Sequence, residues 1–510
     1  MTEGVNGHAE ADGMSQRHPK IPADIDAELS PKVRKFFGDL IDDYDRRIEE
    51  MANRIEVLLK RIEVLEAKLL KLTPKNSSIP PSTQHPHSKE TAQPKKPKSG
   101  NRKQRGGQPG HRRATRSLVP TDECDNVEVL RPTACRKCKT ALKGDDPEPL
   151  RHQIIELPVI KPIVTEYQRH RLICDGCGTQ SCASLPAYVP TGQCGPRLAA
   201  FTGLLMGHFR QSKRRAASFL GDLLNVPCSA GWTVKIQNIV SDALAEPYEQ
   251  LRKELENQKQ LFVDESPTKQ HPSKAWLWVA VAPLFAVFGI FLSRKRDALK
   301  ALVGNYSDVI INCDRAKMYF DGKRLQWCWS HLKRDLQKLI DKPDRQIKRL
   351  GHDLMRQQRQ LFEKWRSYKA NELSWSSFQE AIAPIREEFE SLLLRGQFSG
   401  NSALIGICKE LLKHRAWLWT FTEIQGIEPT NNAAERALRP AVIYRKLSFG
   451  TQSAAGSRFI ERMLTVSETC RIQNRSPYQY LVRAMEAHFA KRSPPSLLQS
   501  IEIATIKKAA

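Results

Sequence analysis

The sequence predicts a multidomain chain with an N-terminal coiled coil, cysteine-rich and helical domains, and an α/β domain interrupted by helices. Three observations predict this order. Apolar residues recur at heptad spacing near the N-terminus, two Cys-x-x-Cys pairs follow, and from Gln260 onward β-branched apolar runs alternate with helical patterns. With 510 residues, of which 40% are hydrophobic, the chain is long enough to build several cores.

The charge of the chain predicts a polyanionic partner. It has 81 Lys and Arg against 56 Asp and Glu, a formal net charge of +25. Such an excess fits DNA, ribosomes and anionic membrane surfaces alike. The first residues lack the charged-then-apolar order of a secretory signal, so the twelve cysteines predict no disulfide framework and we expect a reducing cytoplasm.

One apolar stretch, residues 275–292, contains no charge and reaches the lower length limit of a membrane span. Pro283 interrupts it, and most of its large residues are β-branched or aromatic. We therefore predict two buried strands around a turn at Pro283-Leu284, and no membrane association.

Residues 1–34 are predicted to be a disordered tail and residues 35–74 a coiled coil. A seam at alternating three- and four-residue spacing runs through Ile41, Tyr44, Ile48, Met51, Ile55, Leu58, Ile62, Leu65, Leu69 and Leu72, and Pro74 ends it. The apolar stripe is narrow, which favours self-association over an amphipathic helix packed on its own chain.

Residues 75–120 are predicted to be a basic linker, since eleven Lys or Arg stand against the single acid Glu90. Either a solvated linker or a tether for DNA phosphates fits this composition. The candidate DNA-binding residues here are Arg102, Lys103, Arg105, Arg112 and Arg113.

Residues 121–190 are predicted to bind structural zinc. Cys135-x-x-Cys138 and Cys174-x-x-Cys177 supply four thiolates on two short turns, separated by strand-like alternation such as residues 153–157. A redox role would need only one pair. The spare cysteines that could replace one ligand are Cys124, Cys182 and Cys194.

Residues 191–258 have a helical pattern. The segment from Ala216 through Asn225 to Val234 resembles a helix-turn-helix, and residues 191–258 are predicted to form a helical DNA-binding domain. A generic helical subdomain fits the same short pattern equally well.

Residues 259–485 are predicted to form a ribonuclease-H-like core. Strands are expected at 260–265, 276–282, 287–293 and 309–314, with a helix at 296–303 before the last strand and another helix from Trp327. In that fold the first and fourth strands are neighbours. Helical patterns at about 332–421 predict an all-helical insertion, and residues 486–510 are expected to be a C-terminal tail.

Three carboxylates are the candidate catalytic residues. Asp264 and Asp314 end two strands that should lie side by side, and Glu435 lies in a helical pattern. Hard oxygen ligands of this kind suit two Mg²⁺ or Mn²⁺ ions, and on a basic chain they predict phosphodiester chemistry. The competing interpretations are a strand-end cap, a turn residue and a first-turn glutamate, while Glu265 should point to the opposite face of its strand.

Two further patterns lie near these acids. Arg436, Arg439, Arg445 and Lys446 are candidate contacts to the DNA backbone, although a solvated helix face is the alternative. Cys328 and His331 have a metal-ligand spacing, but with only two ligands a packing or orienting role is favoured.

Several motifs resemble the insertion-sequence-sixty-six family (TnpC-like) of bacterial DDE transposases. They are Lys75-Asn76-Ser77-Ser78, Gly106 to His111, Asp264-Glu265-Ser266, Cys328-Trp329-Ser330-His331, Asn431 to Pro440, Arg445-Lys446, Ser467-Glu468-Thr469 and Pro477 to Leu481. The resemblance covers most of the chain from the coiled coil to about residue 485. Arg315-Ala316 depart from the Gly-Tyr that is common after the second Asp in the family.

The resemblance implies a transposase that binds the inverted-repeat ends of a bacterial insertion sequence, cleaves them and joins the freed 3′-hydroxyls to target DNA. It also implies accessory proteins of the same element and a place near the bacterial nucleoid. Two alternatives stay open: a domesticated, non-catalytic zinc protein that binds DNA, and a ribonuclease-H-like nuclease that cuts without joining.

Overall fold

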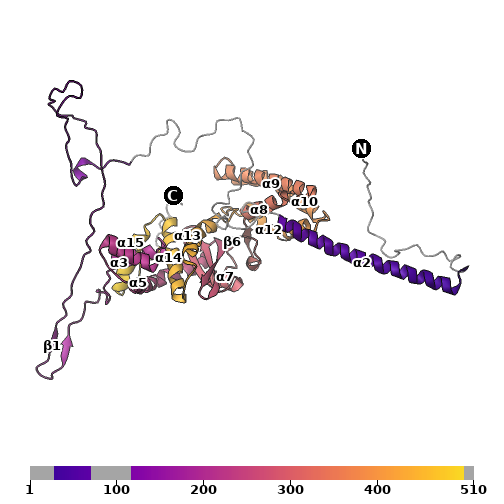
Figure 1. Cartoon of the computed structure of the whole chain (residues 1–510), viewed down its shortest axis with the longest axis horizontal. Helices are drawn as coiled ribbons and strands as arrows, with labels where there is room; N and C mark the ends of the chain where they lie inside the picture. Colours follow the sequence, from indigo (N-terminus) through magenta and orange to yellow (C-terminus); the bar gives the residue numbers. More distant parts are fainter. Residues whose placement is uncertain (1–27, 70–115, 499–510) are drawn as a thin grey trace. The chain divides into compact units, whose positions relative to one another are not determined.

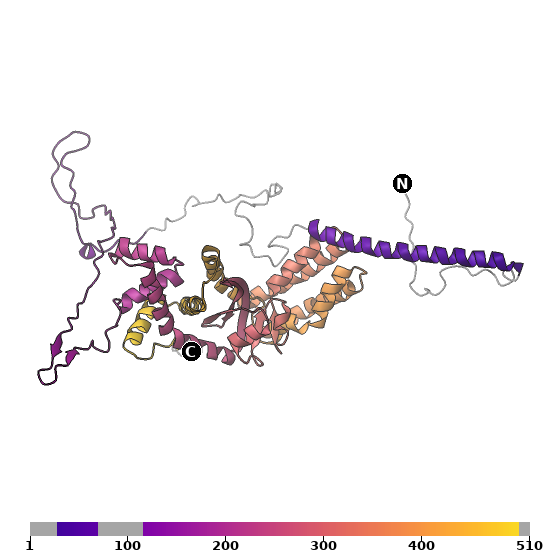
Figure 2. The same cartoon turned by 60° about the horizontal axis from the view of Figure 1, so that its bottom comes forward.

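The computed structural model describes residues 28–69 and 116–498, which fall into two compact units (Figures 1 and 2). One unit contains residues 28–69 and 330–415, and the other contains residues 116–329 and 416–498. Most of the predicted tail and basic linker, including all five basic residues named in that linker, lies outside the described residues.

In the first unit, the long helix α2 (Pro31–Leu69) carries the heptad seam. It begins four residues before the predicted boundary at 35, and residues 70–74 lie outside the described part. Up to Leu59 its large apolar side chains are exposed or half-exposed, including Tyr44, Ile48 and Ile55. Up to Leu59, the seam therefore has no cover within the described chain.

The rest of this unit is helical. Its elements are α8 (Trp329–Ile340, which starts at the end of the other unit), α9 (Arg345–Lys369), α10 (Trp375–Gln397) and α11 (Ser402–Lys413). Asp344 caps α9 by accepting hydrogen bonds from the Gln346 and Ile347 amides at 2.8 and 2.9 Å. Helices α9 and α10 lie side by side (Figure 1). An aromatic cluster that includes Trp365 and Phe378 packs between them.

The second unit is built on a five-stranded sheet. Its strands are β3 (Gln260–Gln270), β4 (Ser273–Val281), β5 (Ala286–Phe291), β6 (Ile310–Cys313) and β7 (Leu325–Trp327), in the order β5-β4-β3-β6-β7. The first three strands are antiparallel neighbours, whereas β6 runs parallel to β3 and β7 parallel to β6. This arrangement fits a ribonuclease-H-like core and places the first and fourth strands side by side, as expected.

The uncharged stretch at 275–292 is the β4–β5 hairpin, as predicted. Among the helices in residues 28–69 and 116–498, none has the length and apolar character needed to cross a membrane. The prediction missed β7, and the helix expected from Trp327 begins at Trp329. Strand β7 has three residues and its buried central residue is the polar Gln326, so no continuous apolar run identifies it.

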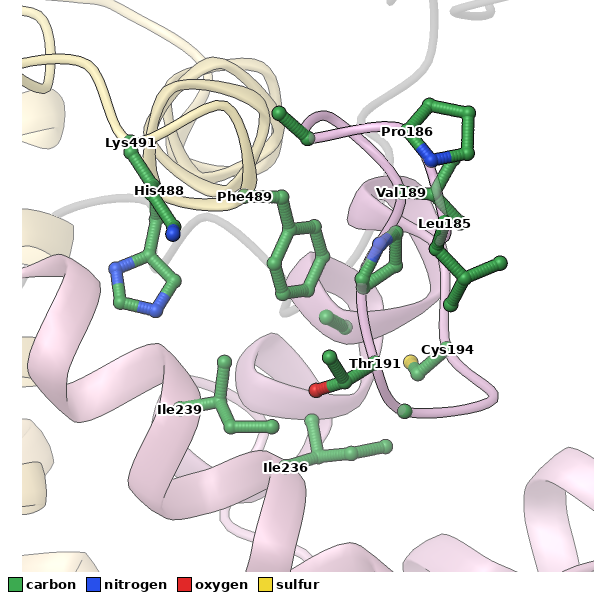
Figure 3. A pocket seen from close by; sticks show the side chains of 14 residues that line it. Leu185, Pro186, Val189, Thr191, Cys194, Ile236, Ile239, His488, Phe489 and Lys491 are labelled. Atoms are coloured by element: carbon green, nitrogen blue, oxygen red, sulfur yellow. The ribbon is translucent and has the colours of Figure 1, made fainter. Parts of the chain in front are cut away.

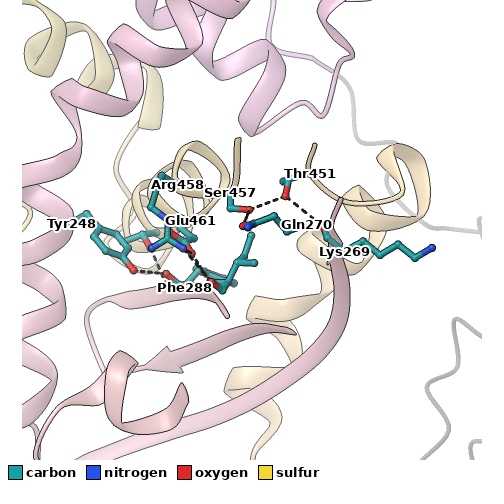
Figure 4. Close-up of polar contacts among 10 residues, drawn as sticks. Tyr248, Lys269, Gln270, Phe288, Thr451, Ser457, Arg458 and Glu461 are labelled. Carbon is teal, nitrogen blue, oxygen red and sulfur yellow. Dashed lines mark hydrogen bonds and ion pairs between the residues drawn. The ribbon is translucent and has the colours of Figure 1, made fainter. Parts of the chain in front are cut away.

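Helices cover the two outer strands of the sheet. On α14 (Ala454–Ile472), three side chains four residues apart accept hydrogen bonds from alternate amides of β5: Glu461 from Ile290, Thr465 from Phe288 and Thr469 from Ala286 (Figure 4 shows Glu461). Four helical residues rise about 6 Å and two strand residues about 7 Å, so the spacings match. At the other edge, Thr420 of α12 (Ala416–Glu423) donates to the Leu325 carbonyl at 2.6 Å.

Glu461 makes the stability of this contact depend on pH. The side chain is fully buried, and burial raises its pKa to about 7 although Arg458 lies beside it. Because the folded pKa exceeds the unfolded value, the folded state binds the proton more tightly, and the free energy of unfolding should fall as pH rises from about 4.5 through 7. Urea unfolding at pH 5, 6.5 and 8 measures this free energy. Between pH 5 and 8 it should fall by about 1–3 kcal/mol more in the wild type than in Glu461→Gln. Parallel pH profiles would contradict this.

The remaining helices of this unit pack on the sheet or beside it. They are α3 (Pro196–Gly207), α4 (Lys213–Leu224), α5 (Ala230–Ala243), α6 (Ala245–Glu254), α7 (Arg296–Val303), α13 (Asn432–Ser448) and α15 (Pro477–Phe489). Helices α7, α13 and α14 contact the sheet, and α3, α4 and α5 pack against one another. The tail predicted from residue 486 is wrong for its first part, since α15 continues to Phe489 and Leu497 is buried.

Residues 116–190 are mostly irregular. Their regular elements are a short helix at Thr121–Glu123 and two antiparallel strands, β1 (Arg171–Ile173) and β2 (Gln180–Cys182). The strand-like alternation at 153–157 forms no strand, so that interpretation is wrong. All of these residues except Gln153 are exposed, and Ile154 and Ile155 are adjacent, so no buried face selects an extended pairing.

Candidate active site

Asp264 lies on the central strand β3, at the point where it passes the end of β6. Leu261 and Val263 before it are fully buried, while Asp264 is half-buried and accepts a hydrogen bond from the Glu265 amide at 2.9 Å. Phe262 is paired with Asn312 in the parallel register of β3 and β6. Continuing that register by two residues places Asp264 opposite Asp314.

Asp314 follows directly after β6. Its carboxylate accepts a hydrogen bond from the Ala316 amide at 2.9 Å, which turns the chain away from the sheet. The residue is half-buried. Asp314 thus follows the end of β6, as predicted. Asp264 instead lies within β3, because the pairing with β4 continues that strand to Gln270, and the prediction that its strand ends there is wrong.

Glu435 lies in the first turn of α13, and Asn431 fixes where that turn begins. Asn431 is the N-cap residue, but its buried side chain does not cap the helix. Its amide nitrogen Nδ2 donates to the Val263 carbonyl at 2.7 Å, and its backbone amide donates to the Cys328 sulfur at 3.1 Å. The residue before Asp264 is therefore tied to the start of the helix that carries Glu435.

The loop before α13 is joined to the other strand ends as well. Asn312 of β6 donates to the Glu428 carbonyl at 2.6 Å, and the Trp329 amide donates to the Pro429 carbonyl at 3.0 Å. These contacts place the start of the Glu435 helix near the carboxyl end of β6, where the two aspartates lie. They involve a buried Asn and backbone groups, which a pattern of charges does not reveal.

The three carboxylates do not close into one tight group. In the described part of the chain, their ligand oxygens do not all lie within 4.8 Å of one another. A Glu435 carboxylate oxygen does lie within 4.8 Å of the Cys328 sulfur. Cys328 is buried and also donates its amide to the Cys313 carbonyl. His331 follows in α8, beyond the start of the other unit at Ser330.

Glu265 takes part in a contact that the sequence did not reveal. Its side chain is only 3% exposed, forms an ion pair with Arg294 at 2.7 Å and accepts a hydrogen bond from the Tyr319 hydroxyl at 2.7 Å. Burial, followed by the charge of Asp314, raises the pKa of Glu265. The Tyr319 contact ties the segment after Asp314 to β3, and no local sequence signal points to Tyr319 or Arg294.

The four basic residues of α13 have different surroundings. Arg436, Arg439 and Lys446 are exposed. Arg445 instead donates to the Ser266 hydroxyl at 3.0 Å and to the Pro267 carbonyl, and burial lowers its pKa. Arg445 thus braces α13 against β3, just beyond Asp264.

The two Cys-x-x-Cys pairs form equivalent turns. The Cys135 amide donates to the Thr140 carbonyl at 2.8 Å, and the Cys174 amide donates to the Thr179 carbonyl at 2.9 Å. Hydrogen bonding with Thr140 lowers the pKa of Cys138 to about 7, the direction that a thiolate ligand requires. Among the described residues the four thiols do not form one group within 4.8 Å. Zinc binding therefore stays a prediction.

Of the spare cysteines, Cys194 is the least suited to bind a metal. It is buried, and burial, followed by the nearby Cys228, raises its pKa to about 12. Cys194 lines an apolar cavity of about 400 Å³ beside α3, α5 and the end of α15 (Figure 3). None of the candidate carboxylates lines this cavity, so it is not part of the candidate active site.

Helices α4 and α5 have the order of a helix-turn-helix. Asn225 ends α4 in a left-handed conformation, and Ser229 caps α5 by accepting a hydrogen bond from the Trp232 amide at 3.1 Å. Lys235 and Asn238 are exposed on α5. DNA recognition by α5 stays a prediction.

Comparisons with known proteins match two parts of the chain. The model of the Transposase IS66 family matches residues 192–458, slightly more than half of the chain, and a family of unknown function (DUF6444) matches residues 23–117. The chain is also 23% identical over 278 residues to "Uncharacterized protein y4qI" of Sinorhizobium fredii (strain NBRC 101917 / NGR234). That match covers 48% of this chain, which spans about half the length of the curated relative. The chain belongs to the Transposase IS66 family, the insertion-sequence-sixty-six family that its motifs resemble.

Proposed function

We propose that this chain is a DDE transposase that cleaves the ends of its own insertion sequence and joins them to target DNA. One observation carries the proposal: Phe262 is paired with Asn312, each two residues before an acid, and Asn431 at the start of the Glu435 helix donates to the Val263 carbonyl. These contacts support a site built from three acids that are distant in the sequence. Membership of a transposase family supports the same function.

The donor set fits divalent cations. Asp264, Asp314 and Glu435 offer hard carboxylate oxygens, and the charge of Asp314 contributes to the raised pKa of Glu265, so negative charge is concentrated near these acids. Two Mg²⁺ or Mn²⁺ ions bound here would stabilise the attacking and leaving oxygens at phosphorus.

In the proposed reaction, the oxygen of water attacks the phosphorus at the element's end and the bond to the 3′-oxygen breaks. This leaves a 3′-hydroxyl and a 5′-phosphate. The 3′-hydroxyl then attacks a phosphorus of the target and displaces a target 3′-oxygen, so no covalent enzyme intermediate forms. Arg436 and Arg439, exposed in the same helix as Glu435, are placed to contact the DNA backbone.

The test uses the full chain, Mg²⁺, labelled duplexes that carry the element's ends, and a supercoiled plasmid. The proposal predicts a labelled product joined to the plasmid. A cut but unjoined end would favour a nuclease, and a mobility shift without either product would favour a non-catalytic DNA-binding protein. Either of these two results would contradict the transposase proposal.

We also propose that Cys135, Cys138, Cys174 and Cys177 bind one structural Zn²⁺, since both turns are already formed. Purified protein should contain about one zinc per chain by mass spectrometry, and Cys135→Ser should lose most of it. Cys182→Ser, which changes an exposed cysteine outside both turns, is the matched control. Equal zinc content in the two variants would exclude the proposed ligand set.

Self-association through α2 is proposed as a parallel two-stranded coiled coil. With Ile41 at position a, Ile48 and Ile55 also occupy a, and Leu58 occupies d; isoleucine at a with leucine at d favours two parallel strands. Position g carries Arg47 and Arg54. An antiparallel pair would set these g positions against each other and bring like charges together, which disfavours that orientation.

Replacing Ile48 and Ile55 together by Asp should convert the dimer to a monomer, because two charges would enter the apolar seam. Light scattering after size exclusion measures the mass. Asn53→Asp changes an exposed residue at position f and should leave the dimer intact. A trimer or tetramer in the wild type, or a dimer that survives the double substitution, would contradict the proposal.

A further inference from the structure

One face of α13 combines cations with exposed apolar side chains. At 100° per residue, the exposed residues of this helix lie within about one third of its circumference. They are Asn432, Arg436, Arg439, Pro440, Ile443, Lys446 and Leu447. The basic residues begin next to Glu435, and the apolar ones continue to the end of the helix, where Phe449 is 79% exposed.

Phe449 is held in an unusual backbone conformation. As the C-cap residue of α13 it has φ 58° and ψ 19°, and its amide donates to the Arg445 carbonyl at 2.8 Å. Glycine or asparagine normally occupies this left-handed position, because a side chain there costs about 1 kcal/mol or more. A large aromatic residue that is both strained and exposed indicates a function for the ring.

The segment after Phe449 is fixed to β3. The Thr451 amide donates to the Lys269 carbonyl at 2.9 Å, and the His271 amide donates to the Thr451 carbonyl at 2.8 Å (Figure 4 shows Lys269 and Thr451). Gly450 approaches so closely that an added Cβ would lie 2.4 Å from the Lys269 carbonyl oxygen. The backbone of Phe449 is therefore held at both sides, and its ring projects from a fixed support.

The length of α13 between Glu435 and Phe449 can be compared with the spacing of base pairs in DNA. Fourteen residues separate Glu435 from Phe449, which at 1.5 Å per residue corresponds to about 21 Å. At 3.4 Å per base pair, this is about six base pairs of DNA.

We propose that Phe449 is a wedge that unstacks a base about six base pairs from the phosphate being cleaved, while Arg436 and Arg439 contact the intervening backbone. This inference rests on the proposed function. Apolar wedges flanked by cations are a general means of deforming DNA, and a base stacks on any aromatic face. A protein partner is disfavoured because the core of a protein interface is depleted of charge, whereas this face alternates cations with apolar residues.

The experiment uses the full-length protein and end duplexes with 2-aminopurine placed three, six or nine base pairs from the cleavage site. With wild-type protein we expect fluorescence to rise at about position six and to change little at the other two. Phe449→Ala should abolish the rise and weaken binding about tenfold, and Phe449→Trp should retain both.

Two further variants separate a role in DNA deformation from a role in folding. Phe449→Asn suits the left-handed conformation, so it should unfold at the same or a higher temperature and yet lose the fluorescence rise. Phe398→Ala removes an equally exposed phenylalanine, 80% exposed at the C-cap of α10, where φ is an ordinary −103°. It should keep the rise.

The outcomes also separate this inference from the proposed function. If wild-type protein binds and cleaves the ends without a rise near position six, the wedge is wrong and the transposase proposal stands. The wedge is equally wrong if Phe449→Ala changes only the molecular mass of the assembly, since the face would then contact protein. If wild-type protein neither cleaves nor joins the ends, the proposed function itself fails.

Discussion

Asp264→Asn should lower the rate of end cleavage at least about a thousandfold and leave binding of end DNA unchanged. The substitution keeps the size of the side chain and removes its charge, so the strand and its contacts remain while a cation ligand is lost. Asp314→Asn and Glu435→Gln should have the same effect. Cleavage of a labelled end duplex measures the rate, and a mobility shift measures binding.

Asp308→Asn is the matched control, because Asp308 is exposed and precedes β6 by two residues. It should cleave at the wild-type rate. Glu265→Gln tests the rival acid on β3, which forms an ion pair with Arg294. If Glu265→Gln abolished cleavage and Asp264→Asn did not, the assignment of these two acids would be reversed.

Asn431→Ala should destabilise the protein by about 1–3 kcal/mol and slow cleavage as well. The change leaves the buried Val263 carbonyl without its 2.7 Å hydrogen bond and frees the start of α13 from β3. Urea unfolding measures the first effect and end cleavage the second. Asn432→Ala alters the exposed neighbouring residue and should affect both far less.

The pattern of the two losses distinguishes the roles of Asn431. A less stable variant that still cleaved at the wild-type rate, under conditions where it is fully folded, would show that this contact holds the fold together without positioning Glu435.

The sequence predicted the elements that rest on local patterns. The apolar runs before Asp264 and Asp314 contain buried β-branched residues, and the pairing of β3 with β6 confirmed the expected adjacency. Strand β7 was missed because Gln326 at its centre is buried by hydrogen bonds to α12, including one to the Phe421 amide at 2.7 Å, nearly a hundred residues away.

The contacts that shape the candidate site could not be predicted for the same reason. The bonds of Glu265 to Arg294 and Tyr319, and of Arg445 to Ser266, join residues 29 to 179 positions apart. A run of basic residues in the sequence shows that a segment is charged, but not which of its side chains face solvent. Arg445 therefore resembled Arg436 in the sequence, although only Arg436 faces solvent.

The covered edges of the sheet limit how copies of this chain can assemble. An open outer strand can pair with a strand from another molecule, in a functional complex or in an aggregate. Here α14 occupies alternate amides of β5, and α12 bonds to β7. Strand exchange at this sheet would first require a helix to detach. We therefore do not expect copies of the chain to assemble by pairing strands at the edges of this sheet.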